Sequence, residues 1–304
     1  MHLNQIEAFV QVVKQGSFSK AAGELYLSQS TVSVHINKLE EELGCRLIIR
    51  TPKSVFPSEF GEVFFRYAVQ VLRIIECAEG AVTQYKEKTS GALTISASTV
   101  PSINILPKSL SEFSKAYPDI NITVIDNDSG EVVNLVESME IEIGIAGYAG
   151  SNPNCNFDAF CRDQLTIITP NTEQYRSFDG VVSAEVLENS NYITRESGSG
   201  TQKQATAFLN SIGVSPNKIK STLHLQSTES VCQAVLHGCG IAIVSKIAVA
   251  ERIERGELLS FDYDSPLLSR HFYIVTHKYV PLTPLAELFA NFLKKSYASE
   301  TTDL

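Results

Sequence analysis

The sequence has no long hydrophobic run and no tight cluster of cysteines. Its longest uninterrupted apolar stretches, around residues 241–244, have the length of a strand, whereas a membrane-spanning helix needs about 18 or more apolar residues. The start, Met1 to Glu7, has neither the basic beginning nor the apolar core of a secretory leader. The six cysteines are scattered over 304 residues, which does not suit a small disulfide framework. We therefore expect a cytoplasmic protein without membrane contact.

An excess of positive charge is also missing. Residues 1–90 contain ten Lys/Arg and ten Asp/Glu, while residues 91–304 contain 15 and 24, which gives the whole net charge of −9. Phosphate contacts supply much of the affinity of nucleic-acid-binding proteins, so a neutral N-terminal part argues mildly against DNA binding. Only motifs can outweigh this observation.

What is present is the composition of a folded globular chain. Hydrophobic residues make up 43% and charged residues 19% of the sequence, and the mean hydropathy is close to zero. A chain of 304 residues exceeds the usual size of one domain, so two or three domains are expected.

Three helices are predicted near the N-terminus. Apolar residues at three-to-four-residue spacing indicate a first helix over residues 3–15, which Gly16 would end. Ser17 can cap a second helix of two turns, and Ser28 can cap a longer third helix that ends before Gly44. This order is typical of a helix-turn-helix, although an ordinary three-helix bundle with a polar face would show the same periodicity.

The exposed face of the third predicted helix carries side chains suited to reading bases. Glutamine can hydrogen-bond adenine through both amide atoms, serine can donate or accept, and valine can lie against a thymine methyl group. The residues on this face are Gln29, Ser30, Ser33, Val34, Asn37 and Lys38.

The beginning of the chain resembles a known family. The matching residues follow one another without gaps: Gly16-Ser17-Phe18, Ala21-Ala22, Leu25, Ser28-Gln29-Ser30-Thr31-Val32-Ser33, Ile36, Leu39-Glu40, Leu43-Gly44, Leu47 and Arg50. They resemble the winged helix-turn-helix of LysR-type transcriptional regulators. The resemblance implies that residues 1–57 bind double-stranded DNA, and it adds Ser28 and Thr31 to the DNA-binding residues.

The resemblance also implies a wing after the third helix. The wing would span residues 51–55, and Arg50, Thr51 and Lys53 would meet phosphate or the minor groove. Where the family commonly has a basic residue just after the motif, this chain has Val34, so one common DNA contact is missing.

A long amphipathic helix is predicted over residues 58–88, which contain no proline and carry a broad apolar stripe. The stripe could be covered by a second copy of the helix or by the chain's own C-terminal domain. The resemblance favours a homodimer or homotetramer linked by this helix. Two DNA-binding domains would then contact half-sites whole helical turns apart, about 34 Å each.

From residue 91 onward the pattern alternates between strands and helices, which predicts an α/β domain. The predicted strands are 93–97, 120–124, 141–146, 165–169, 192–194, 241–244 and 272–276, and the predicted helices are 103–116, 132–137, 201–211, 231–237 and 284–296. The resemblance implies that residues 91–304 form the family's effector-binding domain, which is similar to the two-lobed periplasmic binding proteins. Lobe I would comprise about 91–163 and 268–304, and lobe II about 164–267.

Three loops rich in small polar residues, 98–102, 195–201 and 226–230, each follow a strand and precede a helix. Ligands of open α/β sheets bind at the carboxyl ends of strands, and helix N-termini favour anions, although Ser and Thr there can also be plain helix caps. The effector-binding residues implied by the resemblance are Ser98, Thr99, Ser102, Gly147, Thr194, Ser197, Ser199, Thr201, Ser227 and Thr228. We expect a small anion or carboxylate. Residues 195–201 resemble members governing sulfur and related metabolism, which points to a sulfur-type anion.

Two other functions, an enzyme and a solute-binding protein, fit the sequence less well. An enzyme is disfavoured because the chain has no Gly-x-x-x-x-Gly-Lys-Ser/Thr loop and no Gly-x-Ser-x-Gly elbow, and because Cys232, His237 and Cys239 lack metal-ligand spacing. No catalytic residue, metal or cofactor is expected. A solute-binding protein would suit the C-terminal two-thirds but not residues 1–90. We therefore expect a DNA-binding transcriptional regulator that is switched by a small molecule between two lobes and that recruits RNA polymerase if it is an activator.

Overall fold

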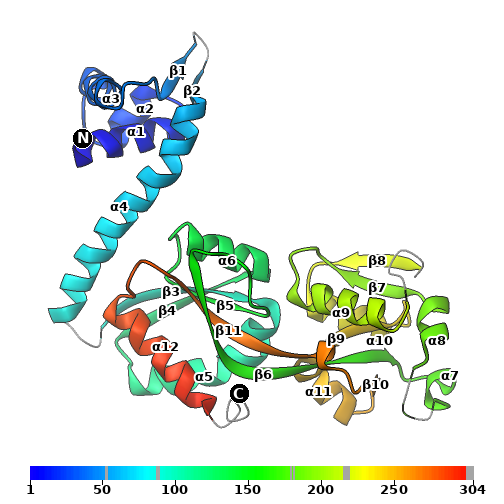
Figure 1. The fold of residues 1–304 in the computed structure, drawn as a ribbon. Coiled ribbons are helices and arrows are strands. Elements are labelled where there is room, and N and C mark those ends of the chain that lie inside the picture. The colour runs from blue at the N-terminus through cyan, green and yellow to red at the C-terminus, as the bar shows by residue number, and fades with distance from the viewer. Residues whose placement is uncertain (52–53, 87–89, 179, 181, 215–219, 299–304) are drawn as a thin grey trace. The chain divides into compact units, whose positions relative to one another are not determined.

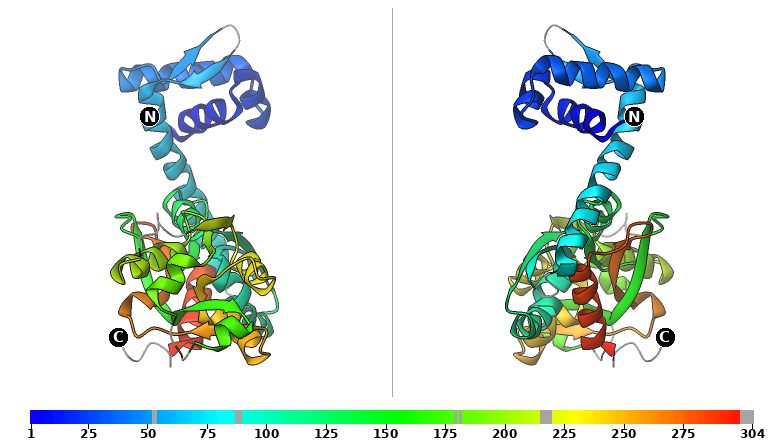
Figure 2. Two further views of the ribbon diagram at one scale, coloured as in Figure 1. Left: turned by 90° about the vertical axis from the view of Figure 1, so that its right-hand side faces the viewer. Right: turned by 90° about the vertical axis from the view of Figure 1, so that its left-hand side faces the viewer.

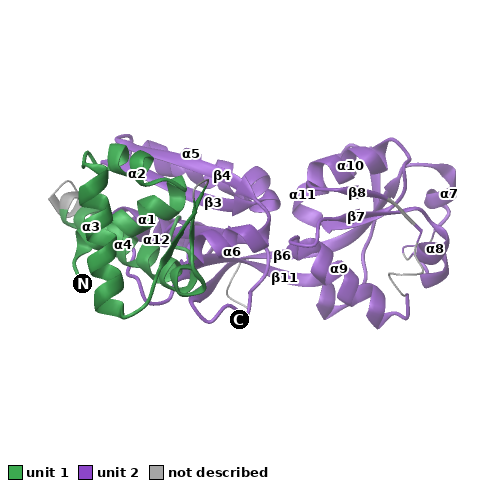
Figure 3. Cartoon of the chain, turned by 90° about the horizontal axis from the view of Figure 1, so that it is seen from above, with its two compact units in different colours: residues 1–83, 138–140 green, residues 84–137, 141–304 purple. Residues whose placement is uncertain are grey.

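We describe a computed structural model of the chain that covers residues 1–304 except 52–53, 87–89, 179, 181, 215–219 and 299–304 (Figure 1). The chain forms two compact units, one of residues 1–83 with 138–140 and one of residues 84–137 with 141–304 (Figure 3). Each unit is described by itself. Among the described residues, no helix is both long and apolar enough to cross a membrane.

The first unit is a helix-turn-helix with a two-stranded wing. Its elements are α1 (Leu3–Gln15), α2 (Phe18–Glu24), α3 (Gln29–Leu43), β1 (Ile48–Arg50) and β2 (Val55–Pro57), and the two strands pair antiparallel. The predicted ends are confirmed: Ser17 and Ser28 cap α2 and α3. Gly16 and Gly44 end α1 and α3 in the left-handed conformation, at φ +58° and +68°.

The core of this unit ties the wing to the third helix. Phe9 is fully buried, and its ring lies 5.3 Å from that of Phe64. The Glu40 carboxylate accepts hydrogen bonds from the backbone N–H groups of Leu47 and Ile48, at 2.7 and 3.0 Å. Because both N–H groups lie on buried residues, the carboxylate fixes where β1 begins relative to α3.

Helix α4 (Glu59–Lys86) is one continuous helix in both views of Figure 2. The Ser58 hydroxyl begins it, accepting a hydrogen bond from the Gly61 N–H at 3.0 Å and donating one to the Arg46 carbonyl. Its exposed large apolar side chains are Phe60, Val63, Tyr67, Val71, Ile74 and Val82. Their spacing of three, four, four and three residues, followed by eight, matches one face of a helix.

The second unit contains two lobes joined by a pair of long antiparallel strands, β6 (Cys155–Pro170) and β11 (Ser269–His277) (Figure 1). Lobe I holds β3 (Gly91–Ser98), β4 (Ile120–Asn127), β5 (Ile143–Ala146), a π-helical turn (Pro101–Ile105), α5 (Leu106–Ala116), α6 (Ser129–Glu137) and α12 (Pro284–Ser296). Lobe II holds α7 (Glu173–Arg176), α8 (Ala184–Asn189), β7 (Tyr192–Arg195), α9 (Gly200–Ser211), β8 (Ser221–Leu225), α10 (Thr228–Leu236), β9 (Ala242–Ser245), α11 (Lys246–Glu254), β10 (Leu258–Phe261) and a 3-10 turn (Pro266–Leu268).

Strand β6 belongs to the sheets of both lobes. The sheet order is β10-β6-β11-β5-β3-β4, with β9 also paired to β6. Residues 155–164 of β6 pair with β11, whereas residues 165–170 pair with β9 and β10. In lobe I, the fully buried Phe113 packs against three aromatic rings. In lobe II, residues 165–168 of β6 enter the core.

Several predicted elements need correction. The predicted helix over 103–116 begins with the π-helical turn, and α6 and α10 each begin three residues earlier than predicted. Their first turns contain Ser129 and Thr228, so apolar periodicity does not reveal them. The predicted strand over 165–169 is the end of the sixteen-residue β6. Elements α7, α8, β8, α11 and β10 were not predicted.

The role of Glu40 gives a stability prediction. We expect Glu40→Ala to destabilise the first unit by about 2 to 3 kcal/mol, because two buried N–H groups lose a charged acceptor. The exposed neighbour Glu41→Ala serves as the control and should change stability by less than about 0.5 kcal/mol. Urea unfolding with hydrogen exchange at Leu47 and Ile48 measures the difference. Equal stabilities of the two variants would contradict this role.

Candidate functional site

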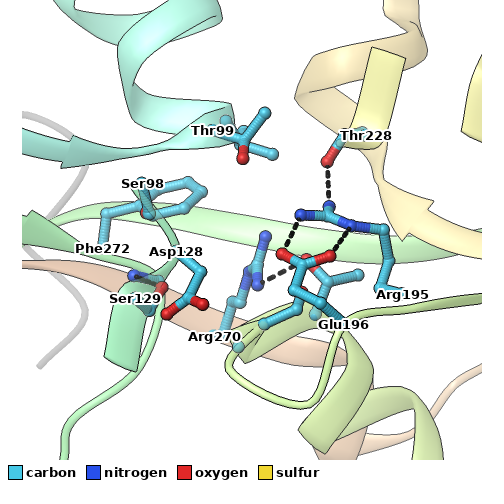
Figure 4. A pocket seen from close by; sticks show the side chains of 14 residues that line it. Ser98, Thr99, Asp128, Ser129, Arg195, Glu196, Thr228, Arg270 and Phe272 are labelled. Atoms are coloured by element: carbon cyan, nitrogen blue, oxygen red, sulfur yellow. Dashed lines mark hydrogen bonds and ion pairs between the residues drawn. The ribbon is translucent and has the colours of Figure 1, made fainter. Parts of the chain in front are cut away.

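A small pocket lies between the two lobes (Figure 4). Its lining is mostly polar and comprises Ser98, Thr99, Val100, Asp128, Ser129, Gly147, Arg195, Glu196, Ser199, Gly200, Thr201, Thr228, Arg270 and Phe272. These residues come from segments far apart in the sequence, so the pocket exists only in the folded chain.

The topology explains why these segments meet. In lobe I, the lining residues lie at or just after the carboxyl ends of β3, β4 and β5, and in lobe II they lie at or after those of β7 and β8. Helices α6, α9 and α10 begin at the pocket, so the positive ends of their dipoles face it. Such helix starts favour a negatively charged group.

Arg195 is one of two buried arginines in the lining, with 5% of its surface exposed. Its Nε and Nη2 donate to the two carboxylate oxygens of Glu196 at 2.8 and 2.6 Å. Its Nη1 donates to the Thr228 hydroxyl at 2.5 Å, and Nη2 also donates to the Gln226 carbonyl at 3.1 Å. Its charge is therefore balanced by a neighbour within the same lobe.

Arg270 is the second buried arginine, with 6% exposed, and it projects from the crossing strand β11. Its Nε donates to Asp163 at 2.7 Å, and its Nη1 donates to the Thr201 hydroxyl at 3.1 Å. The other Asp163 oxygen accepts from the Ser245 hydroxyl at 2.8 Å. Among the described residues, Nη2 of Arg270 has no hydrogen-bond partner. Figure 4 shows this end of the side chain pointing into the pocket.

The lobes lie close together at two glycines of lobe II. A Cβ atom on Gly198 would lie 2.3 Å from the Asp128 carboxylate, and one on Gly200 would lie 3.0 Å from the Gly147 carbonyl oxygen. Beside them, the Lys203 ammonium lies 3.9 Å from the centre of the Tyr148 ring. A larger side chain at 198 or 200 would force these surfaces apart.

Six of the ten effector-binding residues expected from the sequence line the pocket: Ser98, Thr99, Gly147, Ser199, Thr201 and Thr228. The other four lie outside it. Ser102 donates to Asp126, and Ser227 caps α10. Thr194 donates to the Leu223 carbonyl at 3.2 Å, and Ser197 is exposed.

Five charged or aromatic lining residues were not predicted: Asp128, Arg195, Glu196, Arg270 and Phe272. Arg270 gives the clearest signal that could have been used, because it alternates with the apolar Leu268, Phe272 and Ile274 at the two-residue spacing of one strand face. A charge in such a strand must be paired or functional. Asp128 directly precedes α6 and accepts a hydrogen bond from the Glu131 N–H, so helix capping also accounts for its residue type.

The cysteines near this unit's core do not form a reactive site. Burial raises the pKa of the Cys232 and Cys155 thiols to about 11. Both therefore stay protonated near neutral pH and are poor nucleophiles and metal ligands. No group of three or more His, Cys, Asp and Glu within the described ranges could hold a metal ion.

The second candidate site is the exposed face of α3 with the wing. Gln29, Ser30, Asn37 and Lys38 are exposed, and Val34 is 48% exposed. Thr31 and Ser33 are half-buried. The expected DNA-binding residues of α3 therefore share one accessible side, apart from Ser28, whose hydroxyl caps the helix and lies 2.7 Å from that of Ser30.

Arg50 links the wing to this face. Its guanidinium lies 4.0 Å from the centre of the Phe18 ring and donates to Ser33 at 3.2 Å and to Asn37 at 3.4 Å. Thr51 is tied into the wing turn, since its hydroxyl donates to the Ser54 carbonyl at 3.0 Å. Lys53 lies outside the described residues.

Comparison with known proteins identifies both units. Residues 3–62 match the family described as "Bacterial regulatory helix-turn-helix protein, lysR family", and residues 86–298 match the "LysR substrate binding domain". The HTH-type transcriptional regulator CysL of Bacillus subtilis is 29% identical over 301 residues, covering 99% of each chain.

Two solved structures share the fold. Full-length CbnR complexed with its target DNA has a TM-score of 0.65 at 16% identity, covering 97% of this chain and 100% of that one. The CcmR regulatory domain of Synechocystis in complex with 2-PG has a TM-score of 0.62 at 22% identity, covering 68% of this chain and 98% of that one.

The buried Arg270–Asp163 pair gives a prediction about the pocket's frame. Asp163→Asn should destabilise the second unit by about 3 to 5 kcal/mol, because it leaves a buried guanidinium without its counter-charge. The exposed pair of Lys294 and Asp158, whose atoms are 2.8 Å apart, provides the control. Asp158→Asn should cost less than about 1 kcal/mol.

Thermal and urea unfolding of the variants test this. The double variant Asp163→Asn with Arg270→Met should recover part of the loss, since no unpaired charge remains buried. An Asp163→Asn chain as stable as the unsubstituted chain would show that the pair does not hold the strands together.

Proposed function

The chain belongs to the LysR family of transcriptional regulators, and from that premise we propose that a small molecule with an anionic group binds between lobes I and II and controls DNA binding. The observation that carries the proposal is Nη2 of Arg270, which has no hydrogen-bond partner in the described part of the chain and lies at the pocket on a residue that is only 6% exposed. A buried guanidinium with an unused donor is a strong partner for a carboxylate or other oxyanion.

The remaining lining supports the same ligand chemistry. The hydroxyls of Ser98, Thr99 and Thr201 can donate to an anion, and α9 starts at the pocket with Gly200. These donors are held by the fold before any ligand arrives, which lowers the entropic cost of binding. The 2-PG complex of the CcmR regulatory domain is consistent with an effector in this type of domain.

The DNA-binding part of the proposal rests on α3 and the wing. Gln29 and its neighbours present amide and hydroxyl groups of the kind that read base edges in the major groove. Arg50 donates hydrogen bonds to Ser33 and Asn37, so its positive charge lies beside the exposed face of α3 and is suited to phosphate contact. With as many acids as bases in residues 1–90, binding must depend on specific contacts and on two domains acting together.

We propose a homodimer held by α4, with a homotetramer as the alternative. The exposed apolar face of α4, from Phe60 to Val82, needs a cover, and a second α4 would supply a matching face. In an activator, the dimer on its operator would recruit RNA polymerase. The protein would act in the cytoplasm, where bacterial DNA lies.

Ligand binding would act by favouring one arrangement of the lobes. A ligand held by Arg270 and by lobe I stabilises the arrangement in which Gly198 and Gly200 lie against lobe I. A ligand shifts an equilibrium only by its difference in affinity for the two states. The same coupling requires that operator DNA change the affinity for the ligand by an equal factor.

The DNA-reading roles predict different losses for different side chains. Gln29→Ala and Ser33→Ala should each lose about 1 to 3 kcal/mol of discrimination between operator and random DNA. Arg50→Ala should weaken binding to both DNAs alike and reduce the salt dependence of the affinity. Fluorescence anisotropy with the duplex upstream of the chain's own gene, over a range of salt concentrations, measures both effects.

Gln15→Ala at the exposed end of α1 is the matched control and should behave like the unsubstituted protein. If all of these variants lost affinity equally on operator and random DNA, the assigned reading roles would be wrong.

The pocket predicts which substitutions abolish effector binding. In a thermal-shift screen of small carboxylates and oxyanions, the chain should gain stability with at least one compound. Arg270→Gln should remove that gain, and Thr99→Val and Ser199→Ala should reduce it. Each substitution removes a donor, and the loss of one charge-assisted hydrogen bond lowers the binding free energy by about 1.5 to 3 kcal/mol.

The exposed Arg162→Gln on β6 is the control for the lost charge and should keep full binding. Footprints on operator DNA with and without the compound test the coupling. Identical footprints, with ligand affinity unaffected by DNA, would rule out the proposed control.

A further inference from the structure

The charges around the pocket nearly cancel before any ligand binds. The pocket is lined by two positive side chains, Arg195 and Arg270, and by two negative ones, Asp128 and Glu196. Asp163 adds a third negative charge directly behind Arg270. Two positive and three negative charges leave a sum of −1. A ligand with two negative charges and no positive one would therefore enter a site with no surplus positive charge. The free-energy cost of removing its charges from water would not be offset.

The unused hydrogen-bonding atoms are nevertheless of both signs. On the positive side, Nη2 of the buried Arg270 has no partner among the residues that the structure describes, and this end of the side chain points into the pocket. On the negative side, Asp128 uses Oδ1 to accept from the Glu131 N–H at 2.9 Å, and its Oδ2 has no hydrogen-bond partner among the described residues. Figure 4 shows both side chains at the same pocket.

Next to the pocket lies a second hollow whose charged lining residues are all acidic. It shares Thr99, Asp128 and Glu196 with the pocket, and Asp126 also lines this hollow. Glu196 is neutralised by Arg195, but no ion pair reaches Asp126 or Asp128 within the part of the chain that the structure describes. None of the eight residues lining the hollow is Lys, Arg or His. The site therefore combines the Arg270 guanidinium with two carboxylates, Asp126 and Asp128, that have no ion-pair partner among the described residues.

We infer that the effector is zwitterionic, an amino acid or close derivative whose carboxylate binds Arg270 and whose ammonium group binds Asp128. This inference rests on the proposed function and narrows it, since it replaces a simple anion by a molecule with a net charge near zero. An ammonium group donates the hydrogen bonds that Asp128 Oδ2 can accept. Its positive charge also offsets the negative charges of Asp126 and Asp128 in the adjoining hollow. The ligand bridges lobe I, through Asp128, and the crossing strand β11, through Arg270.

Helix capping alone does not require a charge at position 128. Asparagine caps helices about as well as aspartate, so Asp128→Asn keeps the cap of α6 while removing the negative charge. This makes Asp128→Asn a matched test of the ammonium site, and its unfolding temperature without ligand should stay close to that of the unsubstituted chain.

The experiment is a binding screen of the full-length chain by thermal shift, followed by titration calorimetry of the compounds that bind. The probes are the twenty protein amino acids. Each is paired with the carboxylic acid that lacks its amino group, and sulfate and thiosulfate are included. We expect at least one free amino acid to bind about tenfold or more tightly than its des-amino partner. Asp128→Asn should remove this preference, and Asp119→Asn, an exposed control, should retain it.

The outcomes separate the inference from the proposed function. If des-amino acids or sulfate bind as tightly as or more tightly than every amino acid, and Arg270→Gln abolishes that binding, the zwitterion is wrong and the anion-controlled regulator stands. If an amino acid is preferred but Asp128→Asn keeps the preference, the ammonium site is wrong. If no probe stabilises the chain, the proposed ligand class fails and the inference fails with it.

Discussion

The buried ion pair between Arg270 and Asp163 is the interaction on which the second unit depends. It lies where β6 and β11 cross from one lobe to the other, and Ser245 and Thr201 supply further hydrogen bonds from β9 and α9. Removing both charges from water costs several kcal/mol, which their mutual attraction and these further hydrogen bonds offset. Nη2 of Arg270 has no hydrogen-bond partner within the described residues, so the group that holds the strands also addresses the pocket. Stability and ligand recognition therefore share a single side chain.

Much of the fold was predictable because its signals are local. Serine caps and terminating glycines predicted α1, α2 and α3, and apolar periodicity predicted α12. Strands β8 and β10 were missed because each is only four or five residues long and depends on pairing with residues distant in the sequence. Such pairing leaves no mark in a short stretch of sequence.

The candidate site was predicted only in part, for a related reason. The small polar loops after the strands showed where the pocket lies, and six of the expected residues line it. The same loops contain helix caps, so Ser102 and Ser227 had the right type and neighbourhood but other partners. Arg270 and Asp128 are the charged residues on which the proposed ligand contacts depend. Their roles arise from the way β11 and α6 meet in space, which a local sequence pattern does not reveal.

The sharing of β6 between the lobes limits how the second unit can move. A flexible loop can rotate freely at little cost, but here the lobes are joined by two hydrogen-bonded strands, with a local irregularity between Phe272 and Tyr273. Bulges of this kind increase the twist of a strand pair. Relative movement of the lobes must therefore twist this pair of strands. A molecule bound beside the strands opposes or favours that twist, so its size determines how far the lobes can turn.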